Sequence, residues 1–223
     1  MSKIVHPYAH RLVMLRDWKS HWFADPKKYC DFLKRDVLIR EYLEKKLRSM
    51  YVSMIEIERN QKTTRFIIKT SRPGLIIGRN GEGVTKLKED ILKKISKLKL
   101  PKPEDFKLEI VEVSNPEADA AIVAYMIAEG LEKRMPYRRV IKQIVEKVMM
   151  AHGVEGVRVV LGGRLGGAEI ARTEELKRGS IPLQTFRADI DFKRERATLP
   201  YGVIGIKVWI YRGKIFSKKQ ENK

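Results

Sequence analysis

Thr70-Ser-Arg-Pro-Gly-Leu-Ile-Ile-Gly-Arg-Asn-Gly-Glu-Gly-Val84 is the stretch that decides how this chain folds. A strand-like run from Lys62 to Lys69 leads into it, and Pro73-Gly74 marks a change of backbone direction. From Glu82 to Leu98 the apolar residues recur in steps of three and four, which predicts a helix. The stretch therefore predicts a strand, a helical turn, a glycine-bracketed loop and a helix.

The loop consists of Gly78, Arg79, Asn80 and Gly81. Its glycines let a nucleic-acid backbone approach the main chain, and the amides that open the next helix favour anions. Arg79 adds a forked donor that suits phosphate. A Gly-x-x-Gly pattern alone is weak, because it recurs three times later in the chain, but the Ile-Ile before it and the strands around it favour an RNA-binding loop over a glycine-capped turn.

The chain has 223 residues and a formal net charge of +19, from 47 Lys and Arg against 28 Asp and Glu. Such an imbalance predicts a polyanionic partner, either nucleic acid or an acidic membrane surface. No apolar run reaches the length of a membrane span and the N-terminus has no signal-peptide core, so nothing supports a membrane. The single cysteine, Cys30, excludes an internal disulfide and is predicted to be a buried small hydrophobe.

Residues 1–24 are expected to form an extended arm in which basic residues alternate with aromatic ones. Arg11 and Arg16 are predicted to contact RNA, because cations meet phosphates while aromatic planes stack on bases. Trp18 and Trp22 have the alternative role of pinning the arm to a core, and at least one of them is expected to do so.

Residues 25–115 are predicted to form the first domain. Asp25-Pro26 starts a helix that runs to about Arg48, with an expected break near Arg35-Asp36. Two alternating strands follow at 52–59 and 64–70, with a turn at Asn60-Gln61, and a third strand at 106–113 comes after the loop and its helix.

Residues 116–213 are predicted to form a second domain, followed by a basic tail at 214–223. Ser114-Asn-Pro-Glu117 has a capping-box pattern and starts a helix that ends near Lys133. The elements expected after it are a helix from Pro136 to His152, a strand at 157–161, a short helix at 168–177, and strands at 183–192 and 203–211.

The helix from Pro136 gathers its apolar residues on one arc and three cations, Arg138, Arg139 and Lys142, on another. Such a trio is either an ordinary solvated face or a grip for a polyanion, and its spacing leaves both open. Arg164, within a glycine-rich run, is a further candidate RNA contact.

Catalytic patterns are missing from the sequence. The glycine-rich run lacks the Gly-Lys-Ser/Thr ending of a nucleotide-binding loop, and the four histidines show no metal-ligand spacing. Asp189 and Asp191 could share a metal, but neighbouring arginines make salt-paired carboxylates the favoured interpretation. We expect no enzyme activity, no cofactor, no metal and no small-molecule substrate.

Several motifs together resemble the family of bacterial small-subunit ribosomal protein number three. They are Gly163-Arg-Leu-Gly-Gly-Ala-Glu-Ile-Ala-Arg-Thr-Glu174, Arg187-Ala-Asp-Ile-Asp191, Tyr201-Gly-Val-Ile-Gly-Ile-Lys-Val-Trp-Ile210, the Trp18-Lys-Ser-His-Trp-Phe-Ala24 arm and the loop. The resemblance covers essentially the whole chain. It implies an α+β protein with an N-terminal type II KH domain and a C-terminal α+β domain whose mixed or antiparallel sheet packs on two helices.

The resemblance also implies a function and partners. The family is a structural part of the head of the small ribosomal subunit, in the cytoplasm, and contacts rRNA and ribosomal proteins numbered two, ten and fourteen. It lines the channel by which mRNA enters, where Arg138, Arg139 and Lys142 are the matching residues that grip and help unwind mRNA. Arg172 lies in a matching motif and is a further expected RNA contact. The alternatives are a free-standing RNA chaperone and a KH-anchored RNA-processing enzyme.

Two departures from the family pattern affect the expected contacts. The arm has Ala9 and Val13 where the family has small residues, usually glycine, so its backbone path is open. The loop has Asn80 where the family often has a basic residue, which removes one possible phosphate contact.

Overall fold

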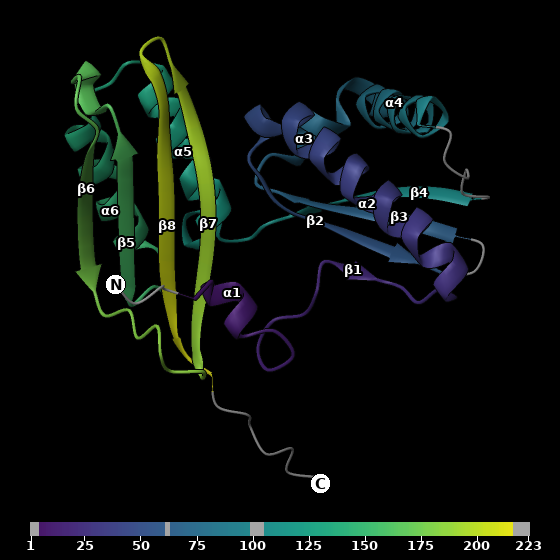
Figure 1. The fold of residues 1–223 in the computed structure, drawn as a ribbon, viewed down its shortest axis with the longest axis horizontal. Helices are drawn as coiled ribbons and strands as arrows, with labels where there is room; N and C mark the ends of the chain where they lie inside the picture. The colour runs from purple at the N-terminus through teal and green to yellow at the C-terminus, as the bar shows by residue number, and fades with distance from the viewer. Residues whose placement is uncertain (1–4, 61–62, 99–104, 216–223) are drawn as a thin grey trace, which may run out of the picture. The chain divides into compact units, whose positions relative to one another are not determined.

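The computed structural model describes residues 5–60, 63–98 and 105–215, which form two units (Figure 1). The loop unit runs from Trp18 to Ser114, and the C-terminal unit combines the segment up to Asp17 with the chain from Asn115 onward. Each unit pairs helices with one sheet, so the predicted α+β class is confirmed. Gln61, the Pro-rich connection at 99–104 and the tail beyond Ile215 lie outside the described residues.

The loop unit has one mixed sheet in the order β1-β2-β3-β4, antiparallel between β2 and β3 and parallel at the other two pairings. Its order of helix, strand, strand, loop with helix, and strand confirms the type II KH arrangement. The elements are β1 (Ser20–His21), α2 (Pro26–Lys46), a 3-10 turn (Arg48–Met50), β2 (Val52–Arg59), β3 (Thr63–Thr70), α3 (Pro73–Ile77), a 3-10 turn (Arg79–Gly81), α4 (Glu82–Lys97) and β4 (Asp105–Glu112).

The core of the loop unit lies where α2 and α4 meet the sheet. Leu43 from α2, Ile91 from α4 and Phe66 from β3 are all fully buried within it. The buried residues of α4 fall in steps of four, at Leu87, Ile91 and Ile95, because that spacing keeps them on one helical face. This core fixes the start of α4, and hence the loop before it.

Helix α2 corrects two predictions. It is continuous through Arg35 and Asp36, where a break was expected, because tertiary partners replace the solvent that those polar residues would need. The carboxylate of Asp36 accepts a hydrogen bond from Trp22 Nε1 at 2.7 Å and forms an ion pair with Arg59. Cys30, expected to be buried, is exposed on this helix.

The C-terminal unit has an antiparallel sheet in the order β6-β5-β8-β7, with α5 and α6 on one face. Asp119 caps α5 by accepting from the amides of Ala121 and Ile122. The elements are α1 (Pro7–His10), a 3-10 turn (Pro116–Ala118), α5 (Ala120–Glu132), α6 (Tyr137–Met150), β5 (Gly156–Gly163), a 3-10 turn (Leu165–Gly167), β6 (Arg172–Gly179), β7 (Ala188–Leu199) and β8 (Gly202–Lys214).

Two elements of this unit differ from their predictions. The prediction of a short helix at 168–177 is wrong, because its second half belongs to strand β6. This strand lies at the exposed edge of the sheet, where Arg172 pairs with Gly163 of β5. An edge strand has few apolar positions, so the period-two signal of a strand is weak there. The strand expected at 183–192 runs instead from Ala188 to Leu199, since its charged half pairs with β8.

The arm expected at residues 1–24 is not one extended segment. Pro7 to His10 form the short helix α1, and the segment containing it packs on the sheet face away from α5 and α6. Ser20 and His21 instead pair in parallel with β2 of the loop unit. Trp22 packs against Tyr29 and Phe32 in that unit, as expected for at least one tryptophan of the arm.

Candidate nucleic-acid interface

The loop at Gly78–Gly81 has a backbone that needs its glycines. Gly78 and Gly81 have φ of 69° and 80°, in the region that glycine adopts most readily. Asn80, with φ 52° and ψ 23°, is also left-handed, a conformation that asparagine tolerates better than most residues. Ile76 is buried in the core and fixes the start of this loop.

A third glycine, Gly83, brings two helices together. A Cβ added there would lie 2.3 Å from the carbonyl oxygen of Ile76 and 2.8 Å from that of Ile77, closer than real contacts allow. The first turn of α4 therefore packs directly on the end of α3. The sequence showed this third glycine two positions after the loop, but only the structure shows what it does.

The loop presents its polar groups outward. Arg79 and Asn80 are exposed, and no side chain caps the N-terminus of α4 at Gly81. Amides at an uncapped helix start attract anions, so phosphate, with Arg79 beside it, suits this site. Leu75 and Ile77, exposed by 56% and 38%, flank the loop with apolar surface on which a base or ribose can pack.

Helix α6 presents the predicted cationic trio. Val140, Ile141 and Val145 are buried against the sheet and fix the helix, while Arg138, Arg139 and Lys142 are exposed. Among the described residues, neither Arg139 nor Lys142 forms an ion pair. The structure thus brings all three together on one rigid, solvent-facing surface, which can hold successive phosphates of a strand.

Arg138 has a partner that the sequence did not reveal. Its Nη2 lies 3.3 Å from Oε1 of Glu174, which also accepts from the Tyr137 hydroxyl at 3.3 Å. The hydrogen bond to Glu174 raises the pKa of Arg138 above its usual value, so the side chain stays charged. Glu174 lies on β6, the strand that was predicted as a helix, which is why sequence spacing missed the pair.

Two further candidates lie on the C-terminal unit. Arg164 is exposed but donates to the main-chain oxygens of Ala168 at 2.9 Å and Tyr201 at 3.3 Å, so it holds the glycine-rich turn in place. Arg172 is exposed at the start of β6. Both belong to the C-terminal unit, whereas the Gly78–Gly81 loop belongs to the loop unit.

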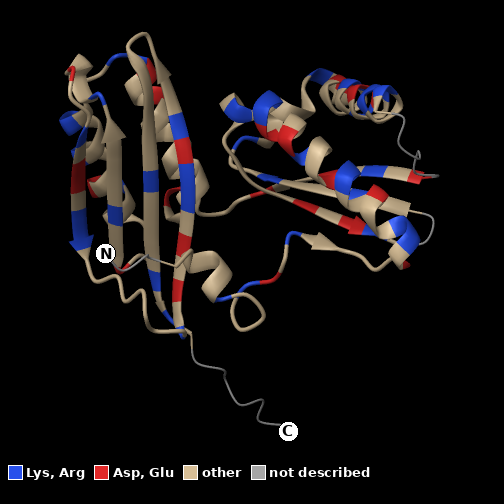
Figure 2. Cartoon of the chain, viewed as in Figure 1, with Lys and Arg blue, Asp and Glu red and all other residues tan. Residues whose placement is uncertain are grey.

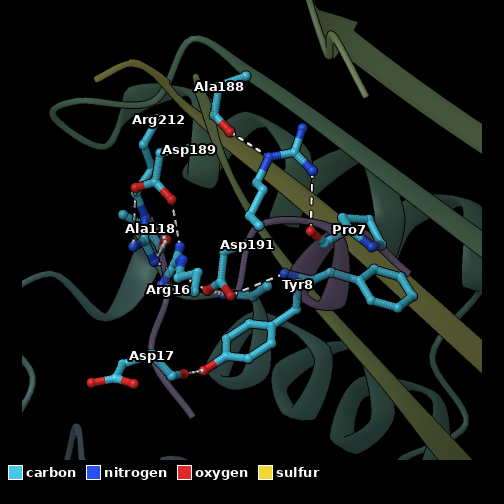
Figure 3. A network of polar contacts seen from close by, with 12 residues as sticks. Pro7, Tyr8, Arg16, Asp17, Ala118, Ala188, Asp189, Asp191 and Arg212 are labelled. Carbon is cyan, nitrogen blue, oxygen red and sulfur yellow. Dashed lines mark hydrogen bonds and ion pairs between the residues drawn. The ribbon is translucent and has the colours of Figure 1, made fainter. Parts of the chain in front are cut away.

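The structure corrects the prediction made for Arg11. It was expected to contact RNA, but its side chain is fully buried. Its guanidinium donates to the carbonyl oxygens of Ala188 at 2.6 Å, Leu183 at 3.0 Å and Thr185 at 3.0 Å, as well as to Pro7 and Pro182. Figure 3 draws the two of these hydrogen bonds that end on Ala188 and Pro7. A buried guanidinium with its donors used in this way is a structural tie, because no face of it remains for phosphate.

Arg16 is likewise engaged within the C-terminal unit. It forms a 2.6 Å ion pair with Asp189, while Arg212 bridges Asp191 and the carbonyl oxygen of Ala118 (Figure 3). Asp189 and Asp191 are therefore salt-paired, as predicted, although their partners come from distant parts of the chain. In the described parts of the chain, no three His, Cys, Asp or Glu side chains gather as a metal site would require.

The described helices also lack any segment with the length and apolar character of a membrane span. In both units the candidate residues are exposed cations carried by ordered elements, namely the loop before α4 and helix α6. Exposed cations on fixed elements suit phosphate.

Comparison with known proteins identifies related sequences in both units. The KH domain family matches residues 38–118, and the family described as ribosomal protein S3, C-terminal domain, matches residues 127–210. The chain is 44% identical over 221 residues to the small ribosomal subunit protein uS3 of Pseudomonas aeruginosa (strain UCBPP-PA14), covering 99% of this chain and 93% of the relative. It is 43% identical over 220 residues to the uS3 protein of Clostridium novyi (strain NT), covering 99% and 96%.

Proposed function

Because the chain belongs to the small ribosomal subunit protein uS3 family, we propose that it binds rRNA in the small subunit and lines the channel by which mRNA enters. The family is an RNA-binding, structural one and not an enzyme family, and the ribosome in which it resides is cytoplasmic in bacteria. The proposed partners are small-subunit rRNA, mRNA and the ribosomal proteins numbered two, ten and fourteen.

The observation that carries the mRNA role is the cationic surface of α6. Arg138, Arg139 and Lys142 extend from a helix whose other face is buried, so the main chain that carries them is already ordered before they bind phosphate. A strand of mRNA held by such a surface is pulled away from its base-paired partner when the ribosome advances. Unwinding is therefore passive or coupled to translocation, since the chain has no nucleotide-hydrolysing motif.

The test changes Arg138, Arg139 and Lys142 together to alanine in assembled ribosomes. Translation through a stable mRNA hairpin should slow several-fold, while translation of unstructured mRNA should be spared. The matched control exchanges the cations for one another, with Arg138→Lys, Arg139→Lys and Lys142→Arg, and should retain most of the activity because the charge is kept. Equal slowing on both mRNAs would contradict the proposal.

For the loop, we propose that Arg79 and the amides around it bind the phosphate backbone of RNA. Changing Arg79 and Asn80 together to aspartate should weaken RNA binding by the purified chain, because two negative charges replace the phosphate contacts. Both side chains are exposed, and aspartate tolerates the left-handed backbone of position 80, so the fold should stay intact. Unchanged affinity, with an unchanged circular dichroism spectrum, would mean that the loop is only a turn.

A further inference from the structure

The sheet of the C-terminal unit has a second face, opposite α5 and α6 (Figure 1). One end of it is covered: Ile190, Phe192 and Trp209 are buried there, with His6 of the N-terminal segment packed on Phe192. Beyond Phe192 the side chains on this face are exposed, including Arg194, Lys207 and Val203, the last by 55%. We call this exposed part the bare sheet face.

Cations dominate the bare sheet face. Alternation along the strands and their register place Arg194, Arg196 and Lys207 on it, with Arg194 opposite Lys207 across β7 and β8. Arg158 and Lys177 point to the same side and lie at its edge, in the row of Phe192 and Trp209. Among the described residues of this face, Glu175 is the one carboxylate, and it pairs with Arg158 at 2.7 Å. Figure 2 marks in blue the Lys and Arg positions along β5, β7 and β8, and the register assigns them to one face or the other.

Two of the arginines are held in place by aromatic rings. The guanidinium carbon of Arg158 lies 4.9 Å from the centre of the Trp209 ring, and that of Arg194 lies 5.4 Å from the centre of Phe192. Since cation–π contacts of this kind restrict the side chains, these arginines lose less entropy when they bind an anion than free surface arginines do.

Two glycines form the floor between these cations. Gly162 on β5 and Gly205 on β8 are directly opposite each other, and neither has a left-handed backbone. A Cβ at Gly205 would meet only the carbonyl oxygen of Gly162, at 3.7 Å, and one at Gly162 only the Thr173 hydroxyl, at 3.8 Å. The fold itself therefore does not require glycine at either position, although glycine inside a strand weakens it.

A pair of strand glycines without a local reason indicates that a partner approaches the main chain closely. We propose that the bare sheet face is a docking platform for the sugar–phosphate backbone of small-subunit rRNA, which lies over Gly162 and Gly205 between the flanking cations. The charge of the face selects a polyanion, and the flat glycine floor admits a ribose against the backbone. This inference rests on the proposed function, because it requires the chain to lie in the small subunit.

The first test maps what lies on the bare sheet face in assembled subunits. Cys30→Ser removes the one native thiol, and Val203→Cys provides an exposed attachment point for an iron–EDTA probe that generates hydroxyl radicals. We expect cleavage of rRNA near the probe, with none in subunits that carry Cys30→Ser alone. If the labelled chain is in the subunit but cleaves only a neighbouring protein, or nothing, the platform is refuted while the proposed function stands. Absence of the unlabelled chain from subunits would instead refute the proposed function.

The second test uses the purified chain and small-subunit rRNA. Gly205→Ala adds only a Cβ, whose one neighbour within 4 Å is the carbonyl oxygen of Gly162 at 3.7 Å, so it should keep the fold while lowering rRNA affinity by on the order of tenfold. Arg194→Gln with Lys207→Gln should reduce the slope of log affinity against log salt by roughly 0.7 for each lost phosphate contact. Lys133→Gln, at the end of α5, is the control: it removes one positive charge away from this face and should reduce the slope by less per charge removed. Variants of the bare sheet face that bind like the wild type would overturn the proposal.

Discussion

Replacement of Arg11 by methionine tests whether this residue is a structural tie or an RNA contact. Methionine keeps an unbranched side chain of similar length but donates no hydrogen bond, so the packing space stays filled. In the wild type the guanidinium ties α1 to the turn at 182–185 and to the start of β7 through five main-chain oxygens. Each of these links belongs to the C-terminal unit, so the effect should be confined to it.

The size of the effect follows from the contacts. Three of the five hydrogen bonds are 3.0 Å or shorter, and bonds from a charged donor contribute about 1.5 to 3 kcal/mol each before coupling is considered. Because one side chain makes all of them, the contributions overlap, and the loss is expected to be about 3 to 5 kcal/mol in total. Burial itself lowers the pKa of Arg11, which shows that holding the charge there has a cost that methionine relieves.

Hydrogen exchange measured by mass spectrometry resolves this loss by segment. Peptides covering residues 182–192 and 205–212 should exchange faster in Arg11→Met without RNA, while peptides of the loop unit should not change. The matched control is Arg172→Met, an exposed arginine whose loss should change stability by less than about 0.5 kcal/mol. If Arg11→Met exchanges like the wild type but loses RNA affinity, the structural assignment of Arg11 is refuted.

Three more perturbations test other parts of the structure. Gly83→Ala should destabilise the loop unit in urea unfolding by about 1 to 3 kcal/mol, because its Cβ would clash with two carbonyl oxygens, whereas Gly74→Ala, with open space around it, should not; equal stability of the two variants would refute the clash. Asp36→Asn should cost about 3 to 5 kcal/mol by the same measurement, because buried Arg59 would lose the carboxylate it pairs with, next to Arg35, whose pKa is lowered to about 10 by burial and then by Arg59; a loss below about 1 kcal/mol would show that solvent reaches Arg59. Val13→Gly should raise the free energy of unfolding by about 1 kcal/mol, and with it the melting temperature. Val13 has φ 72°, which strains a valine, and its side chain is 80% exposed, so little packing is lost; a lower melting temperature would show that the left-handed conformation costs little.

Local chemistry was enough to predict the loop and the cationic helix. The glycines at 78 and 81 and the apolar spacing of α4 lie within one short stretch, so no distant contact is needed to interpret them. The trio on α6 follows from the helical period alone, because residues at i, i+1 and i+4 lie within about 100° of one another around any α-helix. The order of elements in the loop unit was likewise predictable from alternation and turn residues.

Tertiary structure decided which cations remain available. Arg11 and Arg79 look alike in sequence, since each lies in a basic, glycine- or proline-punctuated segment, yet one is buried under a sheet and the other is exposed. Strand β6 and the pairing of Glu174 with Arg138 also required the sheet, because an edge strand takes its hydrogen bonds from a neighbour rather than from its own apolar pattern. The sequence by itself determined the charge and the local elements, whereas burial and partners arise from residues that are distant along the chain, 36 positions for Arg138 and Glu174 and 177 for Arg11 and Ala188, and exist only once the chain has folded.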